Sequence, residues 1–156
     1  MITLRPATTE ELPQLSALIL RSKAYWGYDA AFMKACEDEL RLTPAQLMQS
    51  DVIVACDGDV PLGTASVTQE GERCDLGKFF VDPPAMGRGV GRLIFDWAAS
   101  VAEAYGATEL TIEADPGAAP FYRKMGAVDV GTAPSGSIPG RVLPLLSLPL
   151  PRAQRP

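Results

Sequence analysis

Three glycines alternate with other residues just before an amphipathic segment, and this spacing is typical of an anion-binding loop. The glycines are Gly87, Gly89 and Gly91, and the apolar repeat that follows runs from Val90 to Val101. A helix start presents unpaired backbone N–H groups and about half a positive charge. Glycine has no Cβ, so a ligand can approach its backbone closely. The loop is therefore a candidate phosphate site, and the alternative is a turn that only connects a strand to a helix.

Two arginines add positive charge to this loop. Arg88 and Arg92 are four residues apart, so on a helix they would project from one side and could both bind a phosphate. The apolar face of the same helix is predicted to contain Val90, Leu93, Ile94, Trp97, Ala98 and Val101. The chain has no G-x-x-x-x-G-K-[ST] string, and the loop does not match G-x-G-x-x-G. A Walker loop and a dinucleotide fingerprint are both excluded.

A second segment, from Asp115 to Ala127, has the pattern of a short capped helix. Asp115 is predicted to cap a helix of about ten residues that starts at Pro116 and ends at Gly126. Its inner stripe would consist of Ala118, Phe121, Tyr122 and Met125. The chain has no histidine, which excludes a Ser-His-Asp triad and the usual histidine-bearing metal sites. No metal site is expected, and proton transfer must use a carboxylate, Tyr, Lys, Cys or water.

The remaining elements alternate in a way that would position these two segments. A short strand at Ile2 to Arg5 precedes a helix with apolar residues at Leu12, Leu15 and Leu18. Further helices are predicted at about 30–42 and from Thr43, and strands at 52–56, 60–68, 74–81 and 108–114, with a last strand pair within 134–148. The first three of those strands form a meander. The strand–helix–strand unit around the glycine loop implies a parallel, right-handed crossover.

The glycine loop resembles the acyl-CoA loop of the GCN5-related N-acetyltransferases, written Q/R-x-x-G-x-G/A. The matching residues are Met86 to Gly91, and Met86 stands where the family has Gln or Arg. That departure removes one polar side chain but leaves the backbone donors intact. A second family motif, close to N-x-x-A-x-x-F-Y-x-x-x-G-F, is matched by Asp115, Ala118, Phe121, Tyr122 and Gly126, with Ala127 in place of the last Phe. Two motifs in the right order, separated by one strand, are more specific than either alone.

The resemblance covers the chain from Ile2 to about Leu148 and implies the fold of that family. This α/β (α+β) fold has a mixed, mostly antiparallel sheet of about six to seven strands, splayed between the fourth and fifth, with about four flanking helices. We expect one N-acetyltransferase domain over 1–148 and a disordered tail over 149–156.

The same resemblance implies acetyl-CoA, or coenzyme A, as the cofactor and a small-molecule or peptide amine as the acceptor. Its binding residues would be Phe79, Phe80, Val81, Met86, Gly87, Arg88, Gly89, Val90, Gly91, Arg92, Asp115, Ala118 and Phe121. Tyr122 would be the catalytic residue, as the acid that protonates the leaving thiolate. A backbone N–H near Phe80 or Val81 could polarise the thioester carbonyl. The alternative roles for Tyr122 are core packing or contact with CoA.

The acceptor side has less specific signals. Tyr25, Trp26 and Tyr28 form an aromatic loop that either fills a gap between helices or lines a substrate pocket. Arg141 could bind an acceptor carboxylate. Asp75, Glu72 and Glu113 are candidates for the base, and for these three and Arg141 an ordinary surface role is the alternative.

Composition limits the partners. The chain has 156 residues, 47% apolar and 21% charged, with a net charge of −5. This charge disfavours broad binding to nucleic acid or anionic membranes, and no apolar run is long enough to span a membrane. With no signal core, we expect a cytoplasmic enzyme, with a homodimer left open. Turnover of an amine panel would distinguish this enzyme from an acyl-CoA-binding module with little or no catalysis.

Overall fold

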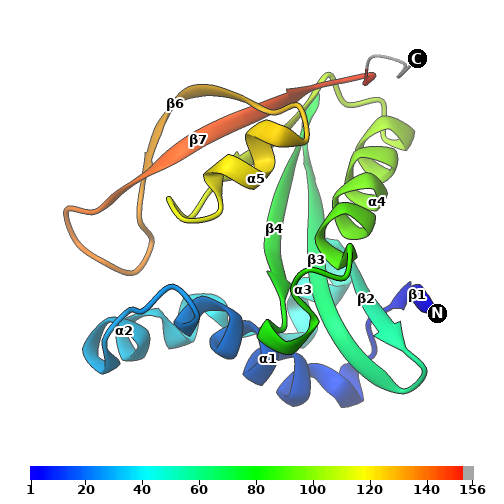
Figure 1. Ribbon diagram of the computed structural model, residues 1–156. Helices are drawn as coiled ribbons and strands as arrows, with labels where there is room; N and C mark the ends of the chain where they lie inside the picture. Colours follow the sequence, from blue (N-terminus) through cyan, green and yellow to red (C-terminus); the bar gives the residue numbers. More distant parts are fainter. Residues whose placement is uncertain (153–156) are drawn as a thin grey trace.

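The computed structural model describes residues 1–152, which form one seven-stranded sheet flanked by helices (Figure 1). The strand order is β1-β2-β3-β4-β5-β7-β6. The strands are β1 (Ile2–Pro6), β2 (Asp51–Asp57), β3 (Val60–Glu70), β4 (Arg73–Val81), β5 (Glu109–Glu113), β6 (Val128–Pro134) and β7 (Val142–Pro149). All neighbouring strands are antiparallel except β4 and β5, which are parallel. The mixed, mostly antiparallel sheet of the prediction is confirmed.

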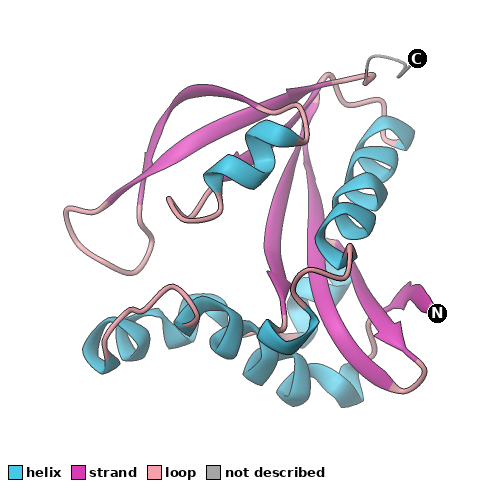
Figure 2. Ribbon diagram, viewed as in Figure 1, coloured by secondary structure: helices cyan, strands magenta, loops and turns pink. Residues whose placement is uncertain are grey.

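The helices pack on both faces of this sheet (Figure 2). They are α1 (Leu12–Ala24), α2 (Ala30–Leu40), α3 (Pro44–Gln49), α4 (Val90–Ala104) and α5 (Ala119–Lys124), with 3-10 turns at Thr9–Glu11 and Pro83–Ala85. Alternate residues of β2 point to opposite faces. Val52, Val54 and Cys56 pack with α1 and α2, whereas Ile53 and Ala55 pack in the cluster that contains α4 and α5. The sheet therefore separates two apolar cores.

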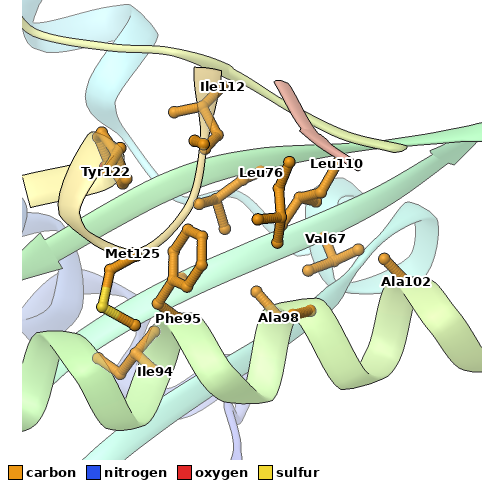
Figure 3. Packing of buried hydrophobic residues seen from close by; sticks show 14 of the residues in the cluster. Val67, Leu76, Ile94, Phe95, Ala98, Ala102, Leu110, Ile112, Tyr122 and Met125 are labelled. Atoms are coloured by element: carbon orange, nitrogen blue, oxygen red, sulfur yellow. The ribbon is translucent and has the colours of Figure 1, made fainter. Parts of the chain in front are cut away.

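The core between α4 and the sheet is the larger one, and Figure 3 shows its packing. The buried residues of α4 are Val90, Ile94, Phe95, Ala98, Ala99 and Ala102. The buried face of α4 is therefore rotated by part of a turn from the predicted face, because Leu93 is exposed and Phe95 is fully buried. The small alanines let α4 lie close to β3 and β4, and Phe95 fills the space beneath α5.

The parallel pair β4–β5 separates partway along its length. Pairing begins at Arg73 with Glu109 and ends at Leu76 with Ile112, although β4 continues to Val81. Lys78 is the one non-glycine residue at positive φ in the described chain, at 47°, and lies where the register of β3 and β4 shifts. Such a bulge changes which face each following residue occupies. Phe79 packs toward α5, while Phe80 packs with the α1–α2 core.

Two predicted boundaries differ from the structure. The helix that carries Tyr122 has six residues, not about ten, because Asp115 to Gly117 form a separate turn. Residues 149–152 of the expected disordered tail are instead packed on the fold, since Leu150 is buried, its N–H donates to the Thr108 carbonyl, and Arg152 pairs with Asp96. Residues 153–156 lie outside the described part of the chain.

Within residues 1–152, no helix combines the length and apolar character needed to cross a membrane.

Candidate functional site

The start of α4 offers a group of free backbone donors. Gly87 and Gly89 have φ values of 86° and 81°, the left-handed conformation that favours glycine, and Gly89 caps the helix. The N–H of Arg88 donates to the Ala85 carbonyl. The N–H groups of Gly87 and of residues 89–92 donate to no acceptor among residues 1–152. Their common position at a helix start makes an anion site.

Close packing connects this loop to α5 and β4. A Cβ on Gly91 would lie 3.3 Å from the Phe121 ring, so only glycine gives α4 this approach without a shift. The Phe121 ring centroid lies 5.7 Å from that of Phe79, on the part of β4 that β5 no longer pairs with. The structure thus brings Phe79, Gly91 and Phe121 together. Val81 and Ala118 are partly buried against the same core, and Val90 is fully buried in it, whereas Phe80 packs on the opposite face of the sheet. Met86 is partly buried.

Tyr122 lies in the same aromatic group and is only 5% exposed. Its ring centroid is 5.5 Å from those of Phe79 and Phe121. Its hydroxyl has no hydrogen-bond partner within residues 1–152, yet no buried polar side-chain atom there is unpaired. The small exposed part of Tyr122 must therefore include the hydroxyl. Burial, with a contribution from the charge of Asp115, raises the pKa of Tyr122 and keeps the phenol protonated.

The two arginines of the loop do not lie on one helix, contrary to the prediction. Arg88 precedes the helix rather than lying within it, and its guanidinium donates to the Asp57 carboxylate at 2.9 Å. Arg92 is exposed at the first turn of α4 and forms no ion pair in the described chain. Arg92 is therefore the cation that is available beside the free N–H groups.

Asp115 has a different role from the predicted helix cap, since the residue before α5 is Ala118. Its Oδ2 accepts hydrogen bonds from the Lys23 ammonium and from the Tyr28 hydroxyl, each at 2.7 Å. Its Oδ1 accepts the Gly117 N–H at 2.9 Å. Burial favours the neutral acid, but these hydrogen bonds are together stronger and lower the pKa of Asp115. We call Lys23, Tyr28, Asp115 and Arg141 the ion cluster.

Arg141 completes the ion cluster from the segment just before β7. One of its nitrogens donates to the Tyr28 hydroxyl at 2.7 Å and lies 3.8 Å from Asp115. Its guanidinium carbon lies 4.8 Å from the Phe32 ring centroid and 5.1 Å from that of Tyr28. These two rings are stacked on each other, with centroids 3.9 Å apart. Burial, followed by the neighbouring Asp115, raises the pKa of Tyr28.

The other aromatic residues of this loop are on the surface. Tyr25 and Trp26 are 58% and 43% exposed, so neither fills a gap between helices. Trp26 lies over Gly117, where a Cβ would be 2.7 Å from the indole ring. Gly117 thereby allows the loop 25–28 to approach the turn that carries Asp115.

The three candidate bases lie in ordinary polar surroundings. Asp75 pairs with Arg73 at 3.0 Å and accepts a hydrogen bond from the Thr111 hydroxyl. Glu72 and Glu113 are exposed and form no ion pair in residues 1–152. Glu113 ends β5, just beyond the last residue that pairs with β4, so it lies beside the point where the strands separate.

Several contacts near this point were not predicted. None of Lys23, Lys78 and Glu39 was among the predicted site residues. The Lys78 ammonium donates to the Glu39 carbonyl, while the Glu39 carboxylate accepts from Ser137. Figure 2 shows the loop between β6 and β7 approaching α2, in agreement with the Ser137 contact. Lys78 and Glu39 are 39 residues apart in the sequence, and Glu39 and Ser137 are 98 apart, so no local pattern could have indicated these contacts.

One recess lies away from these residues. It has a volume of about 560 Å³ and is bounded mainly by β1, the start of β2, α3 and the C-terminal half of α4, including Trp97 and Tyr105. None of the predicted site residues lines it.

Comparison with known proteins gave a consistent result. Residues 12–134 match the family model of the acetyltransferase (GNAT) domain. A GCN5-related N-acetyltransferase from Rhodopseudomonas palustris has 28% identity and a TM-score of 0.79, with 95% of each chain covered. A comparison with curated protein sequences gave no significant match.

Two more distant structures share the fold. The PaiA N-acetyltransferase of Thermoplasma acidophilum, solved with coenzyme A, has 13% identity and a TM-score of 0.80, covering 96% of this chain and 99% of that one. The ribosomal-protein-S18-alanine N-acetyltransferase of Escherichia coli has 18% identity and a TM-score of 0.71, covering 99% and 97%.

Proposed function

Because this chain belongs to the GNAT family of acetyltransferases, we propose that it transfers an acetyl group from acetyl-CoA to a primary amine. The transfer is direct and takes place in a ternary complex of enzyme, acetyl-CoA and amine. The family uses acetyl-CoA, and the residues of the loop suit such a polyanion. The free N–H groups of residues 89–92 would bind its pyrophosphate, with the Arg92 guanidinium beside them.

The acyl arm would lie along the edge of β4 that β5 leaves unpaired, from Gly77 to Val81. Backbone groups on this edge can hydrogen-bond an extended chain, as a neighbouring strand would. A backbone N–H near Phe80 or Val81 would stabilise the negative charge that develops on the thioester oxygen. Phe79 and Phe121 provide an apolar wall beside this edge and exclude water.

In the reaction, the amine nitrogen forms a bond to the thioester carbon, and the carbon–sulfur bond then breaks. Tyr122 would donate its phenolic proton to the departing sulfur. The proton that the amine loses goes to water or to a carboxylate such as Glu113, and the resulting phenolate recovers a proton from solvent. The raised pKa of Tyr122 keeps it in the donating form but reduces the driving force for transfer to a thiolate, because a thiol pKa is about 8.5.

One observation carries this proposal. Gly91, among the free N–H groups at the start of α4, and the ring of Tyr122 both lie against Phe79 and Phe121, next to the part of β4 that β5 leaves unpaired. A donor-binding loop and an acid are thus both adjacent to one gap in the sheet.

The test is turnover of acetyl-CoA with a panel of primary amines, followed by thiol release and by the mass of the acetylated product. Initial rates with both substrates varied should give the intersecting lines of a ternary complex. Parallel lines would indicate an acetylated enzyme and contradict direct transfer. Tight binding of CoA with no acetylated amine would favour the alternative, a binding module. A cytoplasmic location and a homodimer remain predictions.

A further inference from the structure

We propose that the acceptor amine carries a carboxylate, and that Arg141 binds this carboxylate while the amine faces the gap between β4 and β5. This inference rests on the proposed function, because it names the class of substrate that the same site would take. The acceptor would be an amino acid or a similarly small amino carboxylate.

Arg141 is held in one orientation before any ligand binds. Its guanidinium lies over the stacked rings of Tyr28 and Phe32, and its hydrogen bond to the Tyr28 hydroxyl fixes its rotation about that stack. Tyr28 is itself held by Asp115. An oriented guanidinium loses little freedom when it binds a carboxylate through two parallel hydrogen bonds.

Most of the Arg141 donors remain available. A guanidinium has five N–H groups, and only one hydrogen bond from the Arg141 guanidinium occurs within residues 1–152, the one to Tyr28. Its side chain is 20% exposed, and none of its nitrogens is a buried unpaired atom. The remaining donors therefore reach solvent beside the aromatic stack, where a ligand could replace the water.

The charge balance of the ion cluster favours an anion. It contains two cations, Lys23 and Arg141, and one carboxylate, Asp115. The Asp115 carboxylate is 3.8 Å from the nearer Arg141 nitrogen, beyond hydrogen-bond distance, so it does not satisfy the second edge of Arg141. Ser137, in the segment before β7, donates to the Glu39 carboxylate, and the Lys78 ammonium donates to the Glu39 carbonyl, so one further charge of each sign lies nearby. The whole group keeps one positive charge in excess inside an acidic protein.

The ion cluster lies close enough to the candidate acid to affect it. The charge of Asp115 contributes to the raised pKa of Tyr122. Asp115 follows β5 by two residues, directly beyond Glu113 at the separation of β4 and β5. A carboxylate bound at Arg141 would thus lie near Asp115 and the end of β5, where β4 and β5 separate.

The activity test uses matched acceptors, the standard amino acids and their amides, with thiol release as the readout. The amides keep the amine and side chain but lack the carboxylate. We expect acids to be preferred over amides by about 10- to 100-fold in kcat/KM, mostly through KM, as for a charge-assisted contact. Arg141→Gln should remove this preference, and Arg141→Lys should retain part of it. An equal rate for acids and amides, or faster turnover of O-phosphoethanolamine than of any amino acid, would overturn the inference.

The binding test does not depend on catalysis. N-acetylated amino acids, which have the carboxylate and lack the reactive amine, are titrated by calorimetry into the protein saturated with CoA. We expect about 10- to 100-fold weaker binding to Arg141→Gln and no change for Arg123→Gln, a matched arginine paired with Asp129 on the surface. Unchanged CoA affinity would show that Arg141→Gln is folded. If no amine is acetylated, the proposed function fails, but this titration still decides the inference, and equal binding to both variants would overturn it.

Discussion

The two sides of the gap between β4 and β5 are built by different means. The donor side consists of the start of α4, the end of β4 and α5, and it offers backbone N–H groups and aromatic walls. The acceptor side consists of the ion cluster, which joins side chains from positions 23, 28, 115 and 141. The donor side is built from segments that are each continuous in the sequence. The acceptor side is held together by contacts between side chains that are far apart in the sequence.

This difference fits the two ligands that we propose. A backbone site binds any pyrophosphate in the same way, because every residue except proline has an N–H, so it can be identical in enzymes with different acceptors. An acceptor site must discriminate among amines, and side chains from separate loops can change one at a time without disturbing the sheet. We therefore expect donor-side variants to affect all reactions of the enzyme and acceptor-side variants to affect selectivity or stability.

The largest effect should come from removing the Tyr122 hydroxyl. Tyr122→Phe keeps the ring and its packing, so folding and CoA affinity should stay close to normal, while kcat should fall by about 10²- to 10⁴-fold. The deficit should shrink with an acyl donor whose thiol has a lower pKa. Tyr105→Phe, at the far end of α4, is the matched control. A Tyr122→Phe enzyme with near-normal kcat would mean that this tyrosine only packs.

The next effect tests the loop backbone. Gly89→Glu adds a side chain and a negative charge among the free N–H groups, so the affinity for CoA should fall by about 10- to 100-fold in calorimetry. Gly71→Glu is the control, because Gly71 also has a positive φ, 62°, with nothing within 4 Å of its added Cβ. Both variants should lose similar stability from backbone strain. If both also bind CoA normally, residues 87–92 are not the anion site.

On the acceptor side, Asp115→Asn should mainly reduce stability. Lys23 is only 8% exposed, so without a carboxylate its ammonium is buried beside a neutral amide. We expect a loss of about 1–3 kcal/mol in the free energy of unfolding, measured by urea denaturation. Asp129→Asn, whose partner Arg123 is exposed, should lose less than about 1 kcal/mol. Equal losses would place Asp115 among ordinary surface carboxylates.

The stability that Asp115→Asn loses should depend on pH. The pKa of Asp115 lies below that of an unfolded aspartate, about 3.9. The folded protein therefore binds this proton more weakly than the unfolded chain, and the resulting stability is present above pH 4 and lost as the pH falls through the folded pKa. The difference in stability between the wild type and Asp115→Asn should shrink over that range. A hydrogen bond from Arg5 lowers the pKa of the Glu11 carboxylate to about 2. Glu11 affects the stability of both proteins equally, so its contribution cancels in the difference between them. A constant difference from pH 7 to pH 3 would contradict the assignment.

The smallest effect distinguishes the two arginines of the loop. If the Arg92 guanidinium contacts the 3′-phosphate, Arg92→Ala should lower the affinity for CoA by up to about 10-fold and should lower the affinity for dephospho-CoA less. Arg88→Ala should change either affinity by less than about 3-fold, because Arg88 is paired with Asp57. A larger loss for Arg88→Ala would mean that this pair breaks when CoA binds.

The sequence by itself determined the donor side and the order of the elements. Gly87, Gly89 and the apolar repeat after them lie within one local segment, and backbone conformation and helix periodicity depend mainly on neighbouring residues. The same reasoning identified Tyr122 on an inward-facing stripe. It placed the start of α5 too early because the Asp115 side chain is engaged by Lys23 and Tyr28 rather than by the helix.

Only the tertiary structure decided the acceptor side. Lys23 and Asp115 are 92 residues apart, and Tyr28 and Arg141 are 113 apart, so their contacts exist only once the sheet brings α1 beside the end of β5. The bulge at Lys78 likewise depends on the register between β3 and β4. Ion pairs and strand registers of this kind are set by the three-dimensional arrangement of chain segments, which local propensity and spacing do not encode.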